Sequence, residues 1–101
     1  MTTRLDLGWL CDVLASRRGA DPEQSYTARL LAEGPDRIGR KIGEEAAETI
    51  IAGLRLHHAG APSTEVVGES ADLLYHLLVF LTALDVEPAA VAAELERRHR
   101  S

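Results

Sequence analysis

The chain lacks most of the features that mark secreted, membrane and nucleic-acid-binding proteins. It has 101 residues and one cysteine, Cys11, so no internal disulfide can form, and we expect this cysteine to be a small buried side chain. Its net charge of −5 argues against a nucleic-acid partner, which requires a basic face. The longest apolar stretch, residues 73–84, is too short to cross a membrane. The first residues carry Asp6 and Asp12 in place of a signal sequence, so we expect a cytoplasmic protein.

Signals for β-strands are weak, and helical periodicity dominates the sequence. No alternating run of β-branched residues is bounded by turns, whereas apolar residues recur three and four positions apart. The length fits a single domain spanning residues 1–101. We therefore predict an all-α bundle of about four to five helices. Their expected bounds are residues 7 to about 17, Ser25 (as a cap) to Gly34, Pro35 to Leu56 or His58, Ser63 or Thr64 (as a cap) to about Leu84, and a last helix from Glu87-Pro88.

The two longest predicted helices depart from ordinary amphipathic patterning. The third helix has a predicted core-facing row of residues four and three apart: Ile38, Ile42, Glu45, Thr49, Ala52 and Leu56. Glu45 is the charged member of this row. A charge in such a row is either a local error of patterning or a functional site, because local rules tend to be broken where function requires it. In the fourth helix, residues 73–84 are apolar nearly all round, so we expect a second subunit to cover them. The sequence thus predicts a homodimer that completes the core.

Acidic residues are concentrated in two clusters with helical spacing. One is Glu45 and Glu48, with Glu44 beside them, and the other is Glu69 and Asp72. Carboxylates three residues apart lie on the same face of a helix, and the two pairs converge if the helices pack side by side. Gathering anions away from water is costly, and Mg²⁺ relieves this cost while also binding substrate phosphates. The two pairs therefore predict a Mg²⁺ site and chemistry on a phosphorylated small molecule.

Several residues beside the clusters allow two interpretations. Glu44 either joins the site or pairs with Lys41 one turn earlier. His76, one turn after Asp72, either orients that carboxylate or is satisfied inside a helix bundle. The Tyr75 hydroxyl is available to substrate or to a bundle partner. Basic residues near the first cluster either contact phosphates or are ordinary surface charges, and Lys41 is the best placed among Arg29, Arg37, Arg40 and Lys41.

The segments that contain these residues resemble a known family. The spacing ExxE…ExxD is similar to that of the MazG-like all-α nucleotide pyrophosphatases. The segments SYTARLLAEGPDRIGRKIGEEAAETIIA and GESADLLYHLLVFL resemble more specifically the phosphoribosyl-ATP pyrophosphatase (HisE) family, over residues 7–98. The resemblance implies Mg²⁺-dependent hydrolysis of 1-(5-phosphoribosyl)-ATP to 1-(5-phosphoribosyl)-AMP and pyrophosphate, the second step of histidine biosynthesis. It also implies the site residues: Glu45, Glu48, Glu69 and Asp72 as metal ligands, Glu44 and Lys41 as their charged neighbours, and Ser25 and Tyr26 near the substrate. We expect Glu44 to belong to the catalytic group with the four ligands, and Lys41, Tyr75 and His76 to bind the substrate together with Ser25 and Tyr26.

Two other functions and one mechanistic choice stay open at this point. A house-cleaning pyrophosphatase of the same superfamily would act on non-standard NTPs or dCTP, although the SYT and DLLYH segments argue against it. A helical dimerisation module would use its acids only as a solvated surface. The spacing does not identify the general base of the hydrolysis; Glu44 and Glu48 are two candidates, judged by reach to a metal-bound water.

Overall fold

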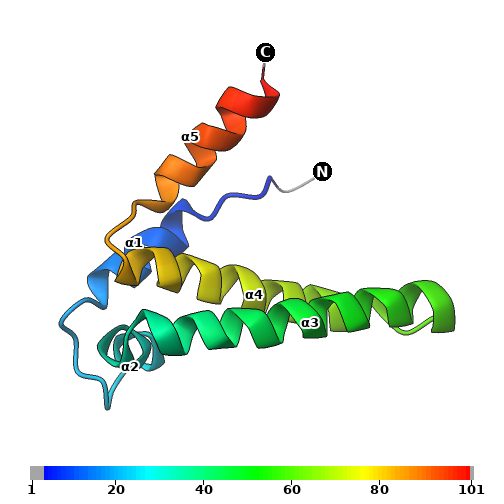
Figure 1. Ribbon diagram of the computed structural model, residues 1–101, viewed down its shortest axis with the longest axis horizontal. Coiled ribbons are helices and arrows are strands. Elements are labelled where there is room, and N and C mark those ends of the chain that lie inside the picture. Colours follow the sequence, from blue (N-terminus) through cyan, green and yellow to red (C-terminus); the bar gives the residue numbers. More distant parts are fainter. Residues whose placement is uncertain (1–3, 101) are drawn as a thin grey trace.

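The computed structural model describes residues 4–100, which form five helices and no strand. Figure 1 shows them in chain order: α1 (Gly8–Ser16), α2 (Tyr26–Glu33), α3 (Pro35–Ala59), α4 (Ser63–Ala83) and α5 (Pro88–His99). The prediction of an all-α chain with about five helices is confirmed. The expected bounds agree with the observed ones to within a few residues at every helix.

The junctions between helices follow from local chemistry. Ser25 caps α2, because its Oγ accepts a hydrogen bond from the Ala28 backbone N–H at 3.2 Å. Gly34, with φ of 97°, ends α2 and directly precedes Pro35, the first residue of α3. The predicted cap of α4 at Ser63 or Thr64 is wrong. Pro62 holds the cap position without a side-chain bond, since its fixed φ of −67° lets the helix begin at Ser63.

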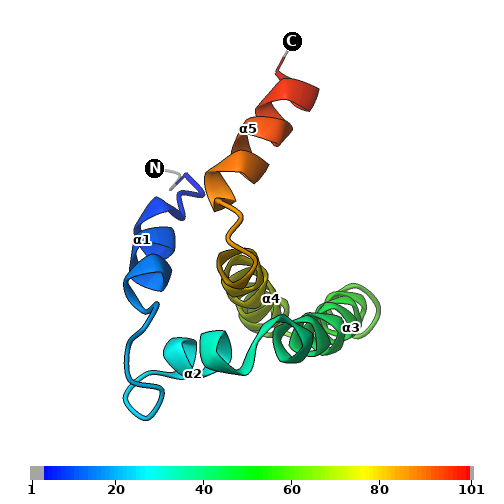
Figure 2. The ribbon, with the colours of Figure 1, turned by 60° about the vertical axis from the view of Figure 1, so that its left-hand side comes forward.

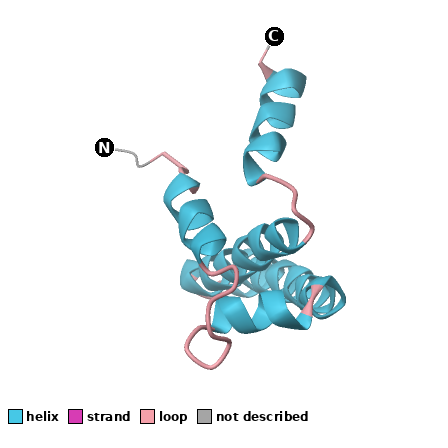
Figure 3. Ribbon diagram, turned by 90° about the vertical axis from the view of Figure 1, so that its left-hand side faces the viewer, coloured by secondary structure: helices cyan, strands magenta, loops and turns pink. Residues whose placement is uncertain are grey.

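The two long helices form an antiparallel pair, and the shorter helices gather at one end of it. Figures 1 and 2 show α3 and α4 side by side along their length, with α2 and α1 against the end where α3 begins. The core lies at this end and takes one fully buried side chain from each of the first four helices: Leu14, Leu30, Ile38 and Val79. Helix α5 has no buried residue and stands away from the others in Figure 3.

The face of α3 that carries Glu45 is buried as the sequence predicts, whereas Glu48 is exposed. Ile38, Glu45 and Ala52, each seven residues apart, are the buried residues of α3, and all three belong to the predicted core-facing row. The far end of that row differs, because Leu56 is 39% exposed where α3 extends beyond the core. Cys11 is only half-buried and is a free thiol.

Helix α4 is strongly apolar, but the rest of the chain buries only a small part of it. Within residues 4–100 it is the one helix that is long and apolar enough to span a membrane, a test that the core helix of a soluble protein also passes. Its most apolar window has a mean hydropathy of 1.4, but only 17% of that window is buried within the chain. A single chain therefore leaves most of α4 uncovered, and the expectation that a second subunit covers it stays a prediction.

Candidate active site

The antiparallel pairing of α3 and α4 sets the two acidic pairs opposite each other. Glu48 on α3 and Glu69 on α4 lie within hydrogen-bonding reach, and this bond, which a protonated carboxyl must donate, is the largest cause that raises the pKa of Glu69. Desolvation and the charges of Glu48, Asp72 and Glu45 raise that pKa further. Glu69 on α4 thus lies within the electrostatic influence of both predicted carboxylates on α3.

Glu45 is the buried member of the group. Its side chain is 8% exposed, and desolvation raises its pKa most strongly. His76 and Lys41 lower the pKa of Glu45, whereas the negative charges of Asp72 and Glu48 raise it. A carboxyl held in this way favours the arrival of a cation, because a cation would replace the hydration that burial has removed.

The side chains fit a hard cation in chemistry, although they do not form a finished metal site. Glu45 Oε1 and Glu69 Oε2 are buried and have no hydrogen-bond partner among residues 4–100. Unpaired carboxylate oxygens of this kind are ligands that Mg²⁺ accepts. Within the same residues, however, no three acidic, histidine or cysteine side chains are grouped so that they could hold a metal ion. The Mg²⁺ site predicted from the sequence therefore stays a prediction, supported by the orphaned oxygens.

His76 connects the acidic group to the rest of the bundle. It is 5% exposed, and its Nδ1 is 2.9 Å from the Asp72 backbone carbonyl and 2.7 Å from Glu45 Oε1. The Nδ1–H aligns with the carbonyl, so Glu45 Oε1 faces the ring without an aligned donor. Nε2 is 3.1 Å from the Tyr26 hydroxyl, which donates to it in this tautomer. His76 thus contacts the Glu45 carboxylate and the Asp72 backbone, and not the Asp72 carboxylate that the sequence suggested.

Helix α2 supplies a second polar contact beside His76. The Thr27 hydroxyl is hydrogen-bonded to the Tyr75 hydroxyl, and the Tyr26 and Tyr75 rings stack with centroids 6.2 Å apart. Burial is the main cause that raises the pKa of Tyr75. Sequence reasoning did not single out Thr27, although it belongs to the SYT segment that carried the family resemblance. Ser25, the cap of α2, uses its hydroxyl within the chain.

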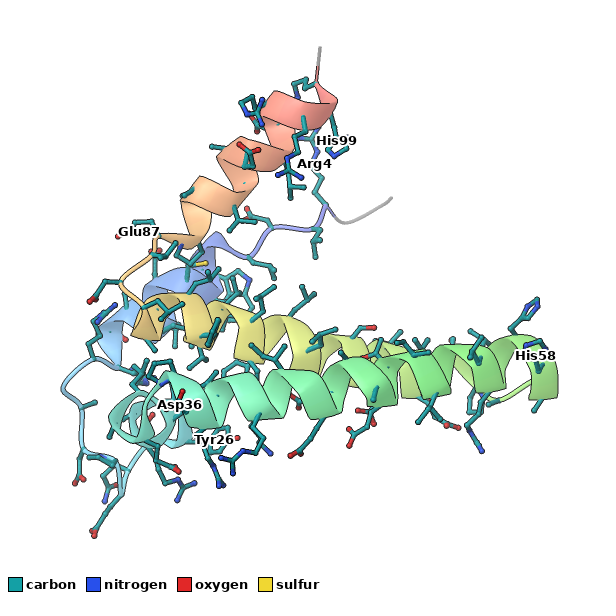
Figure 4. The ribbon with its side chains drawn as sticks, viewed as in Figure 1. Arg4, Tyr26, Asp36, His58, Glu87 and His99 are labelled. Carbon is teal, nitrogen blue, oxygen red and sulfur yellow. The ribbon has the colours of Figure 1, made fainter. Side chains whose placement is uncertain are left out.

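The basic residues near the first cluster line a pocket at the beginning of α3. Its lining residues are Arg37, Arg40, Lys41 and Glu44, and its volume is about 190 Å³. Figure 4 shows Tyr26 below this first half of α3 and Asp36 at its beginning, whereas His58 marks the opposite end of the helix. The Arg29 guanidinium lies outside the pocket lining, 5.5 Å from the centre of the Tyr26 ring. The pocket therefore lies next to Glu45 and Glu48, the α3 members of the acidic group.

Comparison with known proteins gives one consistent result. The sequence pattern of the family described as phosphoribosyl-ATP pyrophosphohydrolase matches residues 7–99. A phosphoribosyl-ATP pyrophosphatase of Burkholderia multivorans is 53% identical over 89 residues, which cover 88% of this chain and 73% of that protein. Proteins of the same name from Burkholderia mallei (strain SAVP1) and Burkholderia pseudomallei (strain 668) are 53% identical over 97 residues, which cover 96% of this chain and 79% of each.

Proposed function

This chain belongs to the phosphoribosyl-ATP pyrophosphohydrolase family, and we propose that the acidic pairs of α3 and α4 are the site at which it hydrolyses phosphoribosyl-ATP. The products are phosphoribosyl-AMP and pyrophosphate, in the second step of histidine biosynthesis. The observation that carries the site is the burial of Glu45 opposite Asp72, with an unpaired oxygen on Glu45 and another on Glu69. The family match supports this activity. No observation supports the two alternative functions, a pyrophosphatase acting on NTPs or dCTP and a non-enzymatic dimerisation module.

The acidic group suits the hydrolysis of a phosphoanhydride. One water adds across the anhydride between the α- and β-phosphates: its oxygen bonds to one phosphorus, and the bridging oxygen leaves with the other. Bound Mg²⁺ would neutralise phosphate oxygens and lower the pKa of the water. Glu45, Glu48, Glu69 and Asp72 would hold it. Glu44 or Glu48, both exposed on the same stretch of α3, would accept the water proton.

The five predicted substrate residues divide by accessibility. Tyr26 is 43% exposed and Lys41 lines the basic pocket, so both are proposed to touch the substrate. Ser25, Tyr75 and His76 are hydrogen-bonded within the chain, and we propose that they support the site from behind these two residues. Tyr26 belongs to both groups, because its ring is open to solvent while its hydroxyl is hydrogen-bonded to His76.

The proposed site is tested by turnover of phosphoribosyl-ATP with Mg²⁺ and with EDTA. Asp72→Asn and Glu48→Gln are expected to lower kcat/KM about 100-fold or more, because each removes a charged ligand oxygen, with the fold retained in circular dichroism. Glu23→Gln, an exposed acid in the loop before α2, is the control and should keep wild-type turnover. The proposed site would be refuted if Asp72→Asn kept full activity in Mg²⁺, or if EDTA left the wild-type activity unchanged.

We further propose that the protein is a cytoplasmic homodimer in which two α3–α4 pairs form one four-helix bundle. Val67, Leu74 and Leu77 on α4 are exposed in the single chain, and Ile50 and Leu54 on α3 are more than half exposed. Apolar faces of this kind are buried in stable oligomers, and a small domain gains core by pairing.

The proposed dimer is tested by light scattering after size-exclusion chromatography. Leu74→Glu is expected to give monomers, because it places a charge in the proposed interface. Leu5→Glu, at an 81% exposed position outside the helices, should remain dimeric. A monomeric wild type would refute the dimer.

A further inference from the structure

The face of α3 that carries the acidic group continues as a basic face toward the beginning of the helix. Arg37, Lys41, Glu44 and Glu48 are spaced four, three and four residues apart, so they lie along one face of an unbroken helix. At 1.5 Å per residue, Lys41 is about 10 Å and Arg37 about 16 Å from Glu48 along the axis. One helix face therefore passes from cations to carboxylates within the length of a small ligand.

The basic part of this face lines a shallow hollow on the surface of α3 that is open to solvent. Arg37, Arg40 and Lys41 line it with Glu44, so three cations meet one carboxylate in a chain whose net charge is −5. Within residues 4–100, Arg40 and Lys41 make no ion pair, and the Arg37 Nε is 3.3 Å from Glu33 Oε2 on α2. The pocket therefore has cationic groups left to pair with an external anion.

Charge links the pocket to the proposed reaction site. Lys41 lies one helical turn before Glu45 on α3, so its ammonium is carried on the same part of the helix as the buried carboxylate. An anion bound between the two regions would meet metal-bound carboxylates at one end and bare cations at the other. A polyphosphate fits this order, since its inner phosphates need a metal beside carboxylates and its outer phosphates pair directly with Arg and Lys.

We propose that the pocket formed by Arg37, Arg40 and Lys41 is a subsite for the terminal phosphates of the substrate, the pair that leaves as pyrophosphate. The assignment rests on the proposed function of the acidic group and extends it to the leaving group. Phosphoribosyl-ATP also carries a monophosphate on its second ribose, which has the same phosphate chemistry. The pyrophosphate end is favoured because the pocket adjoins the carboxylates without a break along α3.

Two arginines of α3 give a closely matched pair of variants for the test. Arg37 pairs with Glu33 and Arg55 pairs with Glu65, each at 3.3 Å, and the two arginine side chains are 55% and 58% exposed. Arg37→Gln and Arg55→Gln therefore remove the same charge, and the same kind of ion pair, from one helix. Only Arg37 lies in the pocket. Equal melting temperatures of the two variants would show that their stabilities are matched.

The measurement is the affinity of each protein for inorganic pyrophosphate, by calorimetry at constant excess Mg²⁺ and by product inhibition. We expect Arg37→Gln and Arg40→Gln to weaken pyrophosphate binding about tenfold or more, the usual effect of losing a hydrogen bond to a charged group. Arg55→Gln should bind pyrophosphate as the wild type does. Inhibition by phosphoribosyl-AMP should be the same in all four proteins, because it lacks the departing phosphates.

Each other result overturns the assignment. Equal losses in Arg37→Gln and Arg55→Gln would indicate general electrostatic attraction, and a loss confined to phosphoribosyl-AMP would place the ribose monophosphate in the pocket. Unchanged pyrophosphate affinity in both pocket variants would leave the pocket without a role in binding. The calorimetric arm needs no turnover, so a wild type that binds pyrophosphate through Arg37 but does not hydrolyse phosphoribosyl-ATP would separate failure of the proposed function from failure of this subsite.

Discussion

Glu45→Gln is expected to stabilise the metal-free protein while it removes the metal response. The Glu45 side chain is 8% exposed, and its Oε1 has no hydrogen-bond partner among residues 4–100. A buried polar group without a partner costs about 1–3 kcal/mol, and a neutral side chain of the same shape avoids the charged part of this cost. We expect a gain of about 1–2 kcal/mol in EDTA, and each kcal/mol raises the Tm of a domain of this size by about 4–8 °C.

The difference between Glu45→Gln and wild type should depend on pH with a definite sign. Desolvation raises the pKa of Glu45 in the folded protein above the value of 4.5 that it has when unfolded. The folded state therefore binds more protons between the two pKa values, so wild-type stability falls as pH rises through this window. Below about pH 4.5 the carboxyl is protonated in both states and contributes nothing. The Tm advantage of Glu45→Gln should therefore be small at the lower end of a pH 5–8 series and largest at the upper end.

Metal should reverse the order of stability. A ligand at 100 times its Kd stabilises the folded state by about 2.7 kcal/mol, and wild type should gain this amount in Mg²⁺ while Glu45→Gln gains less. Thermal unfolding followed by circular dichroism, at one protein concentration with EDTA or Mg²⁺, measures both effects. Glu44→Gln, at the exposed neighbouring position, should leave the metal-free Tm unchanged. A metal-free Glu45→Gln less stable than wild type would refute the claim that burial of this charge opposes folding.

Two further changes test the contacts around the acidic group. His76→Asn keeps a donor where Nδ1 meets the Asp72 carbonyl, whereas His76→Gln keeps only the Nε2 position beside Tyr26. We expect the Gln variant alone to lose Mg²⁺ affinity, by about 10- to 100-fold in calorimetry, and equal losses would contradict an orienting contact through Nδ1. Ser25→Ala should lower the unfolding free energy by about 1 kcal/mol in urea, since it deletes the cap of α2. A kcat reduced as strongly as in Asp72→Asn would show that the Ser25 hydroxyl does more than cap the helix.

The elements of the fold were predictable where one short stretch of sequence decides them. Gly34 ends α2 because glycine adopts its positive φ without strain, and Pro35 begins α3 because its fixed φ suits the first turn of a helix. The cap of α4 was not predictable in the same way. Serine and threonine are the usual caps, but the proline directly before them had already fixed the backbone at the helix entrance.

The site was predictable along each helix and not across helices. The periodic row that contains Glu45 already indicated its burial, because periodicity reports which face turns inward. The partners of His76 depend on packing between α2 and α4, since Tyr26 is 50 residues away in the chain. The sequence therefore identified His76 but left open whether it orients the Asp72 carboxylate or is satisfied inside the bundle, and the structure shows it bonded within the bundle. The arrangement of the four carboxylates around an ion depends on side-chain rotamers, which no spacing rule specifies.

A single residue, Gly34, joins α2 to α3, so its backbone conformation helps to set the orientation of α2. No loop separates α2 from α3, and a β-carbon built on Gly34 would meet no described atom within 4 Å, so only its φ of 97° resists a larger residue. A residue that cannot adopt this φ is expected to change the orientation of α2, and with it the position of the Tyr26 hydroxyl that contacts His76. A glycine with no side chain of its own thus helps to determine how α2 reaches the histidine beside Glu45.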